Sequence, residues 1–454
     1  MTNHGRESTA LMTRSRPEAR QPSNRTNAVR LLTCYLVLLM AIPSSLVVGP
    51  LGGAGAPAGL FAVVLLCWYL IAWQHPLLPL DTGHQPVRVA AILFGCVTVA
   101  AYVSANRIPM AVLEENGADR GLIMLAGWMG VVLLAADGID SEERLATLIR
   151  RIVIGATAMA SVGIVEFFTG MSFAQYIVIP GLSVHTPVTG LLNVVGLARA
   201  TATASQPLEL AAVLGIVLPL AIHQARFAPA ALRVRRWLQV GLIATAMPMT
   251  VSRSAILVGA VVALVLFPTW PKRHRHRAYR AVLGALVVTW LTAPSMLSSF
   301  GDLMSHFSSD SSITSRTAAY SSAGSLIAAH PWFGQGFQTF FPQTYFYVDN
   351  QYVTSTIETG LAGVLCLVAL FITGWFVARS ARRMACDIKT RDLMQCFAAS
   401  VAAAAVSFST FDALSFVIAP GLTFLMLGCA GAAWRFTRMQ RSASGSGSIL
   451  ASHD

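Results

Sequence analysis

The side chains of this sequence that could carry chemistry are a few arginines and carboxylates set between apolar stretches. Arg199, Arg253 and Arg316 each stand close to serine or threonine, and Asp349 and Glu358 follow further along the chain. An arginine fork binds the paired oxygens of an anion, and a carboxylate can accept a proton. These residues are therefore the candidates for binding a charged group and for acid–base chemistry.

The first stretch, residues 199–209, leads from a polar segment into an apolar one. Pro207 suits the first turn of a helix, where its missing N–H group costs nothing. Gln206 and Glu209 flank this predicted helix start, and Arg199 precedes it. Two interpretations are open: a simple helix start with interfacial polar residues, or a set of substrate-binding side chains.

The second and third stretches each place an arginine beside an apolar segment. Ser252-Arg253 lies between two apolar runs, where an arginine is costly unless it faces water, a partner or the lipid headgroups. Ser315-Arg316 is followed by His330 and then by a Gly-x-Gly turn. His330 precedes a proline, and two roles are open for it: shaping this loop or acting as a base.

The fourth stretch places polar side chains at the start of a long apolar segment. Asp349 and Asn350 are good N-cap residues, so helix capping is the alternative to a catalytic or binding role. Glu358 lies inside the apolar segment and should face the helix bundle or a cavity. Gly360 and Gly363 lie on nearly one face, and we expect them to permit a close contact with another helix.

Composition indicates the class of protein that must position these residues. The chain has 454 residues, of which 55% are hydrophobic and 11% charged, and its mean hydropathy is +0.62. Soluble domains carry about 25% charged residues, so a water-soluble enzyme, a disordered protein and a nucleic-acid reader are excluded. The net charge of +12 is divided among short clusters between apolar runs, which is typical of a polytopic membrane protein.

Apolar stretches of about the length of a membrane helix recur along the chain. A bilayer helix needs roughly 20 apolar residues, because only bonding within the helix satisfies its backbone there. We predict an all-α transmembrane domain at residues 29–435, between a disordered cytoplasmic tail, 1–28, and a flexible cytoplasmic tail, 436–454. No metal-ligand spacing is recognisable in the sequence. The predicted membrane helices are residues 31–49, 56–73, 89–104, 121–137, 152–169, 207–224, 237–251, 254–270, 281–297, 352–378, 393–410 and 414–434, twelve in all.

The basic residues also predict an orientation, because cytoplasmic loops are enriched in lysine and arginine. With both termini in the cytoplasm, all but five of the 32 basic residues lie on the cytoplasmic side. The five on the outer side include Arg199, Arg253 and Arg316. Two long loops, residues 170–206 and 298–351, lie on that side as well. Long loops on one side of a helix bundle commonly carry function, so we expect an extracytoplasmic active site.

In this order, the four stretches resemble the O-antigen ligase and polymerase family, and the resemblance covers roughly residues 190–435. Each motif is degenerate alone, and their order on one predicted face makes the resemblance more specific. The resemblance rests on three matches: an arginine-bearing motif before a helix at residues 250–254, an S-R … h-P-x-x-G-x-G loop at residues 315–337, and the spacing of an H-N-x9-G-x-x-G signature at residues 349–363.

This resemblance implies a metal-independent membrane glycosyltransferase with a GT-C-like fold and no cofactor. Such an enzyme transfers a glycan from a polyprenyl diphosphate carrier to an acceptor sugar hydroxyl outside the cytoplasmic membrane. The implied catalytic residues are Asp349, Arg253 and Arg316: the arginines would bind the departing diphosphate, and Asp349 would receive the hydroxyl proton. The implied substrate-binding residues are Arg199, Gln206, Glu209, Ser252, His330, Asn350 and Glu358.

One departure from the family pattern concerns Asp349. Ligases of this family carry a histidine at the corresponding place, and an aspartate there looks more like the exopolysaccharide polymerase branch. Asp349 could serve as the base or could orient the acceptor hydroxyl, and the sequence leaves both roles open.

Our leading hypothesis is a polymerase of polysaccharide repeat units. One alternative is O-antigen-ligase-type transfer of a finished glycan to a lipid, protein or wall acceptor, and another is a secondary transporter or lipid flippase. We expect the chain in the cytoplasmic (inner) membrane of the cell envelope. The expected partners are the polyprenyl-diphosphate-linked glycan, the acceptor glycan, the lipid bilayer, a chain-length regulator and a flippase, with no nucleic acid among them.

Overall fold

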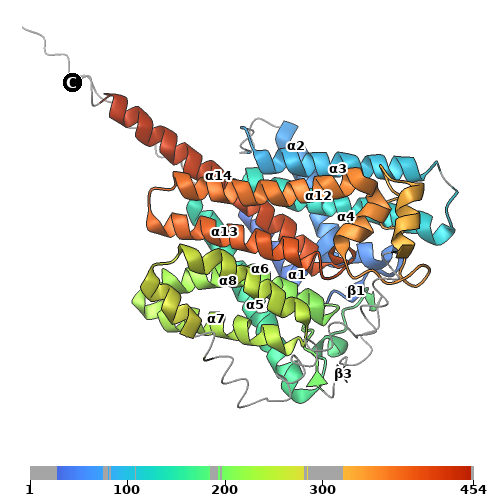
Figure 1. The fold of residues 1–454 in the computed structure, drawn as a ribbon, viewed down its shortest axis with the longest axis horizontal. Helices are drawn as coiled ribbons and strands as arrows, with labels where there is room; N and C mark the ends of the chain where they lie inside the picture. Colours follow the sequence, from blue (N-terminus) through green and yellow to red (C-terminus); the bar gives the residue numbers. More distant parts are fainter. Residues whose placement is uncertain are drawn as a thin grey trace, which may run out of the picture.

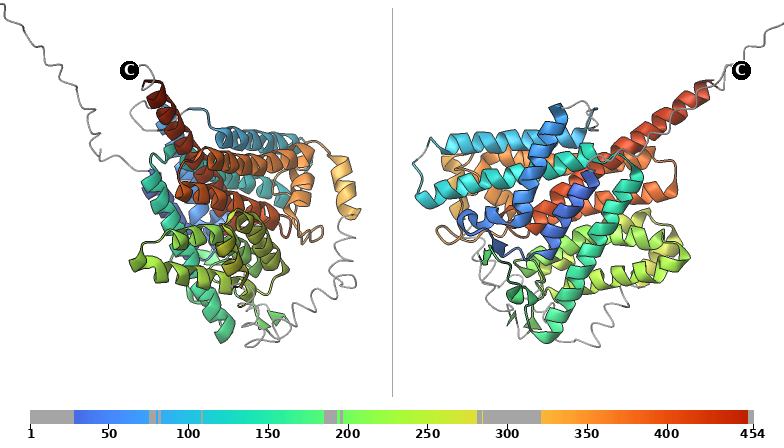
Figure 2. Two further views of the ribbon diagram at one scale, coloured as in Figure 1. Left: turned by 60° about the vertical axis from the view of Figure 1, so that its left-hand side comes forward. Right: turned by 180° about the vertical axis from the view of Figure 1, so that it is seen from behind.

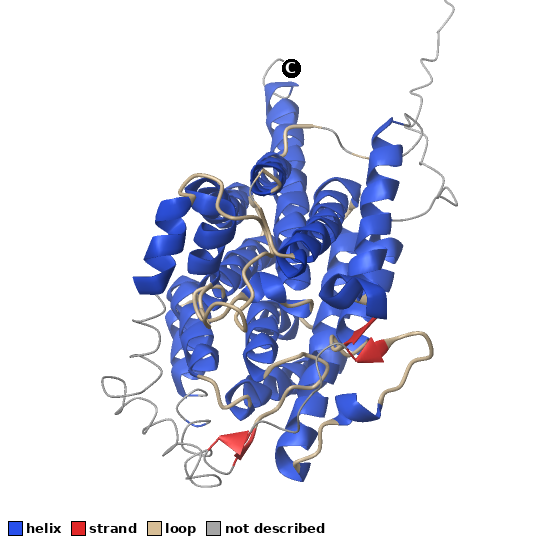
Figure 3. Ribbon diagram, turned by 90° about the vertical axis from the view of Figure 1, so that its right-hand side faces the viewer, coloured by secondary structure: helices blue, strands red, loops and turns tan. Residues whose placement is uncertain are grey.

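The computed structural model is built almost entirely of helices, with very short strands (Figure 3). It describes residues 28–74, 80, 83–107, 109–184, 193–194, 197–280, 284 and 321–450. Within these residues, six helices are long and apolar enough to cross a membrane. The chain is therefore a mostly helical, multi-pass membrane protein, as predicted. The predicted span 281–297 lies outside the described residues apart from residue 284, so the number of twelve spans stays a prediction.

The described helices follow the apolar stretches, because each stretch satisfies its own backbone by bonding within the helix. The long helices are α1 (Ala28–Ala41), α2 (Pro57–Gln74), α3 (Pro86–Ala105), α4 (Val112–Gly138), α5 (Glu142–Thr169), α6 (Pro207–Arg226), α7 (Ala230–Met249), α8 (Arg253–Leu266), α12 (Gln351–Met384), α13 (Ile388–Ser407) and α14 (Ile418–Leu450).

Several shorter elements connect these helices. Residues 272–280 and 321–329 are also helical. The strands β1 and β2 pair antiparallel, as do β3 and β4. The short elements are β1 (Leu46–Val47), β2 (Ser183–Val184), β3 (Asn193–Val194), β4 (Leu197–Ala198), η1 (Gly49–Gly55), η2 (Phe173–Tyr176), η3 (Phe267–Thr269) and η4 (Ala413–Ser415).

Proline and glycine set several of the helix boundaries. Proline is the first residue of α2, α3 and α6, where no N–H group is needed. The first predicted helix, 31–49, is shorter in the structure, since α1 ends at Ala41 and Pro43 follows. A helix interior cannot accommodate a proline without losing a hydrogen bond, and the glycine-rich residues that follow form η1 instead.

The core of the bundle is formed around α14. Every residue from Ile418 to Thr437 is buried, and the helix contacts α4, α12, α13 and α6. Figure 1 shows α3, α4 and α12 along one side of the molecule, α6, α7 and α8 along the other, and α13 and α14 between them. Because it is covered all round, α14 has no polar face over this length.

The helix ends gather into two groups at opposite ends of the bundle. At one end, here called the loop end, Gln351 at the start of α12 donates to the Phe408 carbonyl just after α13. At the other, here called the tail end, His223 of α6 contacts Asp392 near the start of α13. The loop end carries the described parts of both long loops, and the tail end carries the C-terminal part of α14 (Figure 1).

The last helix runs further than the sequence suggests. The tail predicted as flexible begins at residue 436, but α14 continues to Leu450 and extends away from the helical body (Figure 2). Extending an existing helix adds one hydrogen bond per residue, whereas starting one is costly. Residues 438–441, Arg-Met-Gln-Arg, are good helix formers, so the helix propagates beyond the last buried turn, whereas the serines and glycines of residues 442–448 favour it less.

Candidate functional site

The turn between α7 and α8 determines where Arg253 lies. α7 ends at Met249, directly after Pro248, and Arg253 is the first residue of α8 with Ser252 as its N-cap. Between the helices, Val251 has a φ of 45°, which is a strained conformation for a β-branched residue. Strained backbone of this kind is concentrated at functional sites. We call this turn, residues 249–253, the arginine junction.

Arg199 reaches the same junction from the first long loop. Its Nε donates a hydrogen bond of 3.1 Å to the Thr250 carbonyl oxygen, and the Ala200 amide donates to the Met249 carbonyl oxygen at 3.1 Å. Burial lowers the pKa of Arg199. The side chain nevertheless remains charged, because the ordinary pKa of arginine is far above neutral pH. Among the described residues, the two terminal nitrogens of Arg199 have no protein partner. The tertiary structure thus brings two of the predicted arginines to one turn.

Glu166 of α5 holds the two sides of the first long loop in place. Its Oε2 accepts hydrogen bonds from the amides of Thr201 and Ala202 at 3.0 and 2.6 Å, and its Oε1 accepts one from the Phe173 amide at 3.1 Å. The side chain is fully buried, and buried carboxylates require such partners. The sequence analysis did not single out Glu166. An acidic residue in the last turns of an apolar helix could have indicated a buried carboxylate with hydrogen-bond partners.

Glu209 connects the start of α6 with the start of α14. Its Oε2 accepts a hydrogen bond from the Ser205 amide at 2.9 Å, and its Oε1 accepts bonds from the Ile418 and Ala419 amides at 2.7 and 3.2 Å. The first amides of a helix have no partner within it, so a fully buried carboxylate suits them. The structure gives Glu209 the role of a scaffold, and its predicted contact with substrate stays a prediction.

A break in α12 receives part of the second long loop. Gly360 has a φ of 68° and a ψ of −171°, a conformation that essentially only glycine adopts. The break leaves backbone groups on both sides without helical partners, and the loop satisfies them. We call this set of four bonds the backbone interlock: Gln335 N to Ile357 O at 3.0 Å, Gly336 N to Glu358 O at 2.9 Å, Leu361 N to Pro331 O at 2.8 Å and Ala362 N to Trp332 O at 3.2 Å.

The expected role of the glycines in this helix therefore needs correction. The sequence predicts that Gly360 and Gly363 permit contact with another helix. A Cβ atom on Gly360 would instead lie 2.3 Å from the carbonyl carbon and oxygen of Trp332, which belongs to the loop. Gly334 has a φ of 65°, and its Cβ would lie 2.4 Å from the carbonyl carbon of Glu358. The two glycine motifs of the family pattern thus pack against each other.

Three carboxylates gather at the loop end near the start of α12. Asp349 is exposed, whereas Glu358 is buried, as predicted. The Oε1 of Glu358 accepts a bond of 3.4 Å from the Phe340 amide, and its Oε2 has no hydrogen-bond partner among the described residues. The third acid is Asp412, half-buried between α13 and η4, whose charge interacts with both of the others.

Asp412 has a pKa close to the range useful for proton transfer at neutral pH. Burial raises the pKa of Asp412 to about 6, hydrogen bonding to Ser415 opposes the rise, and the negative charge of Asp349 adds to it. Sequence reasoning missed this residue. The available signal was an acid in the short connection between the last two predicted helices, on the predicted outer side.

Gln351 joins the turn that carries Asp412 to the start of α12. Its amide donates to the Phe408 carbonyl at 2.8 Å, and its side-chain Oε1 accepts from the Leu414 amide at 2.7 Å. One residue earlier, Asn350 is the N-cap of α12 and accepts from the Tyr352 amide, which is the capping alternative that the sequence left open. Its predicted contact with substrate stays a prediction. The same few residues therefore fix both Asp349 and Asp412.

The remaining predicted site residues lie in varied surroundings. Arg316 lies outside the described residues. Gln206 is the exposed N-cap of α6 and makes no side-chain capping bond. Ser252 is buried, with its Oγ 2.5 Å from the Oγ of Ser254. His330 is half-buried, and its carbonyl oxygen accepts a bond from the Gly334 amide that shapes the turn.

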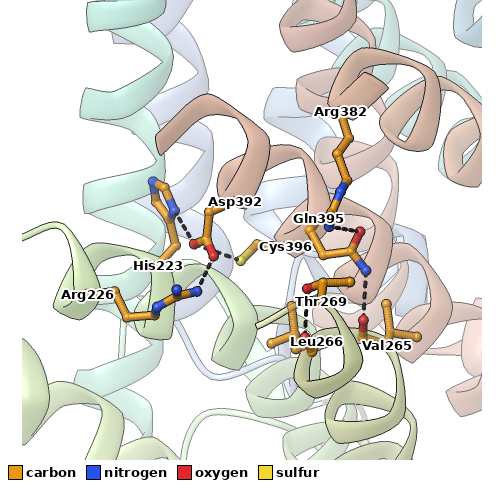
Figure 4. A network of polar contacts seen from close by, with 9 residues as sticks. All are labelled: His223, Arg226, Val265, Leu266, Thr269, Arg382, Asp392, Gln395 and Cys396. Atoms are coloured by element: carbon orange, nitrogen blue, oxygen red, sulfur yellow. Dashed lines mark hydrogen bonds and ion pairs between the residues drawn. The ribbon is translucent and has the colours of Figure 1, made fainter. Parts of the chain in front are cut away.

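A second polar cluster lies at the tail end (Figure 4). His223 Nδ1 lies 2.8 Å from Asp392 Oδ2, and Cys396 is close enough that the three side chains could together hold a metal ion. However, Arg226 forms an ion pair with Asp392, and the charge of Arg382 acts on Cys396. Two guanidinium groups oppose a further cation, so we describe this cluster as a connection between α6 and α13.

Comparison with known proteins identifies the segment that contains most of the loop-end residues. Residues 238–368 match the family model described as O-antigen ligase. No curated protein matches the chain. The matched segment includes the arginine junction, the backbone interlock, Asp349 and Glu358, whereas Arg199 and Asp412 lie outside it. This match confirms the resemblance that the motifs predicted.

Proposed function

We propose that this chain is a membrane glycosyltransferase that polymerises polysaccharide repeat units. The premise is the match of residues 238–368 to the O-antigen ligase family model. It transfers a glycan from polyprenyl diphosphate to an acceptor sugar hydroxyl at the extracytoplasmic face of the inner membrane, and both chain termini lie in the cytoplasm. The observation that carries this proposal is the meeting of Arg199 with the arginine junction, at the same end of the bundle as three carboxylates.

The arginine junction is suited to the leaving group of this reaction. The acceptor oxygen forms a bond to the anomeric carbon, while the bond from that carbon to the diphosphate oxygen breaks and its electron pair leaves with the diphosphate. Arg253 and Arg199 supply positive charge at one turn, and guanidinium forks bind phosphate oxygens in pairs. We place Arg316 with them on the family resemblance. Fixed positive groups at a developing anion commonly supply the largest catalytic contribution.

The carboxylates are suited to the proton that the acceptor hydroxyl loses. A base works best when its pKa lies near the working pH. With its pKa raised to about 6, Asp412 meets this condition more closely than a carboxyl group at its ordinary value. We therefore propose that Asp349 and Asp412 act together: Asp349 contacts the acceptor, and one of the pair takes the proton. Tyr347, an exposed aromatic residue two positions before Asp349, offers an apolar face to the acceptor sugar ring.

The second candidate function is transfer of a finished glycan to a lipid, protein or wall acceptor. The description of the matching family, O-antigen ligase, favours it. The aspartate at position 349 favours the polymerase, because the ligases that the motifs resemble carry a histidine there. Both reactions use the same donor chemistry and differ in the acceptor.

Glycan analysis of a deletion strain distinguishes the two candidates. Loss of a polymerase leaves single repeat units on the carrier, whereas loss of a ligase leaves long carrier-linked chains. Complementation with the wild-type gene should restore the polymer, and complementation with Arg253→Ala should not. A deletion strain with unchanged carrier-linked glycans and unchanged polymer would contradict both candidates.

A further inference from the structure

A pocket at the tail end lies at the opposite end of the bundle from the residues of the proposed reaction. Its volume is about 410 Å³, within the usual range for small-ligand sites. It lies where α14 changes from buried to exposed, directly after Thr437. We call it the tail-end pocket, and its lining consists of Gly83, His84, Trp434, Arg435, Arg438, Met439 and Ser442.

Hydrogen bonds to the body of the protein fix one wall of this pocket. Arg435 is buried and donates from Nη1 to the Asp137 carbonyl oxygen at 3.2 Å, with a second bond to the Ile139 carbonyl. Arg88 forms an ion pair of 2.9 Å with the Asp137 carboxylate and also donates to the Gly83 carbonyl. The part of α14 around Arg435 and the residues at 83–84 are therefore held to the end of α4, and the pocket is preformed.

Positive charge exceeds negative charge around this pocket. Among the described residues that line the pocket, two are arginines, Arg435 and Arg438, and none is a carboxylate. The nearby Asp137 is paired with Arg88, and Glu142 accepts a hydrogen bond from Gln440. The Arg438 guanidinium lies over the Trp434 ring, 5.4 Å from its centroid, and no described carboxylate pairs with it. The pocket therefore has the electrostatics of an anion site.

The lining combines this charge with an apolar wall. Trp434 presents one ring face to Arg438, and its ring lies 6.3 Å from the ring of His84 in an edge arrangement. Met439 is about half exposed at the same place. Basic pockets beside apolar surface at the cytoplasmic ends of membrane helices bind lipid headgroups. A free anion would use the charge but would have no use for the apolar wall.

We propose that the tail-end pocket binds the phosphate group of an anionic phospholipid. Arg438 contacts the phosphate, Arg435 and His84 border it, and Trp434 and Met439 lie against the glycerol and the first part of the acyl chains. The lipid would hold α14 against the body of the protein at the predicted cytoplasmic surface. This proposal is independent of the reaction at the loop end.

Binding of defined lipids to the purified full-length protein tests this site. The protein is delipidated in detergent and titrated with phosphatidylglycerol or with phosphatidylcholine, and bound lipid is counted by native mass spectrometry. Arg438→Gln removes the exposed charge of the pocket. Arg383→Gln is the matched control, since Arg383 is an exposed arginine at the same end of the bundle and does not line the pocket.

For Arg438→Gln we expect the apparent affinity for phosphatidylglycerol to fall about fivefold. This fall corresponds to roughly 1 kcal/mol, the contribution of one arginine at an anionic surface. Arg383→Gln and phosphatidylcholine binding should show no such change. An equal fall in both variants, or none in either, overturns the proposal. Displacement of the lipid by inorganic phosphate, dependent on Arg438, would keep the phosphate site but overturn the lipid as its source. Unchanged thermal melting of Arg438→Gln shows that the comparison concerns folded protein.

Discussion

The backbone interlock at Gly360 can be tested with a single methyl group. In Gly360→Ala the new Cβ would lie 2.3 Å from the carbonyl atoms of Trp332, and the residue would have to keep a φ of 68°. An L-residue in this region of backbone conformation costs about 1–3 kcal/mol, and forced overlap in a packed site costs about 1–3 kcal/mol more. The methyl group has no open space to move into, because the atoms that it meets belong to backbone.

The alternative for this variant is to open the interlock. Opening gives up four backbone hydrogen bonds, each worth about 1 kcal/mol net. Since both routes cost similar amounts, we expect Gly360→Ala to lose about 4 kcal/mol of stability. At roughly 2 °C per kcal/mol, as for large domains, the melting temperature in detergent should fall by roughly 8 °C. Transferase activity should fall as well, because the interlock places Glu358 beside Asp412.

Gly241→Ala is the matched control for this experiment. Gly241 lies in α7, is exposed, and a Cβ atom added there meets nothing within 4 Å. Replacing a helical glycine by alanine favours the helix by about 1 kcal/mol, so this variant should melt at the wild-type temperature or slightly above it. If Gly360→Ala also melts at the wild-type temperature and remains active, then the loop is not inserted into a broken α12 and our description of the site is wrong.

Three further predictions concern the charged residues of the loop end. Arg253→Ala should lower glycan transfer from a polyprenyl diphosphate donor about 10²–10³-fold in an in vitro assay, and wild-type rates would contradict the proposed role of the arginine junction. Asp349→Asn removes a negative charge that raises the pKa of Asp412, so that pKa should fall and the acid limb of the pH–rate profile should move to lower pH. Loss of activity at every pH would instead identify Asp349 as the base. Glu209→Ala leaves buried amides at the start of α14 without an acceptor, which costs about 1–3 kcal/mol for each group, and an unchanged melting temperature would refute its scaffold role.

Much of the loop end could be predicted because the signals are local. The start of α6 at Pro207 and the capping of α12 by Asn350 follow from residue type and from the pattern within one turn. The burial of Glu358 follows from its position in an apolar run. The order of the motifs predicted the resemblance to the O-antigen ligase family, and the match of residues 238–368 to that family's model supports it for this segment.

Other features of the site depend on contacts that no local pattern records. Glu209 bonds to Ile418, more than 200 positions away, and its own neighbours only suggest a helix start. Gly360 looks like a residue for helix packing until the loop backbone is placed against it. Asp412 becomes noteworthy only when Asp349 and Glu358 lie beside it.

By itself, the sequence determined that this chain is a helical membrane protein with a set of O-antigen ligase motifs. Hydropathy and hydrogen bonding within each helix act over a few residues, so the linear pattern is sufficient for these features. Only the tertiary structure decided that Arg199 joins the arginine junction, that α12 is broken to receive the loop, and that Asp412 joins the carboxylates. These features arise where distant helix ends pack together, since the groups left unbonded at one end find partners on another segment of the chain.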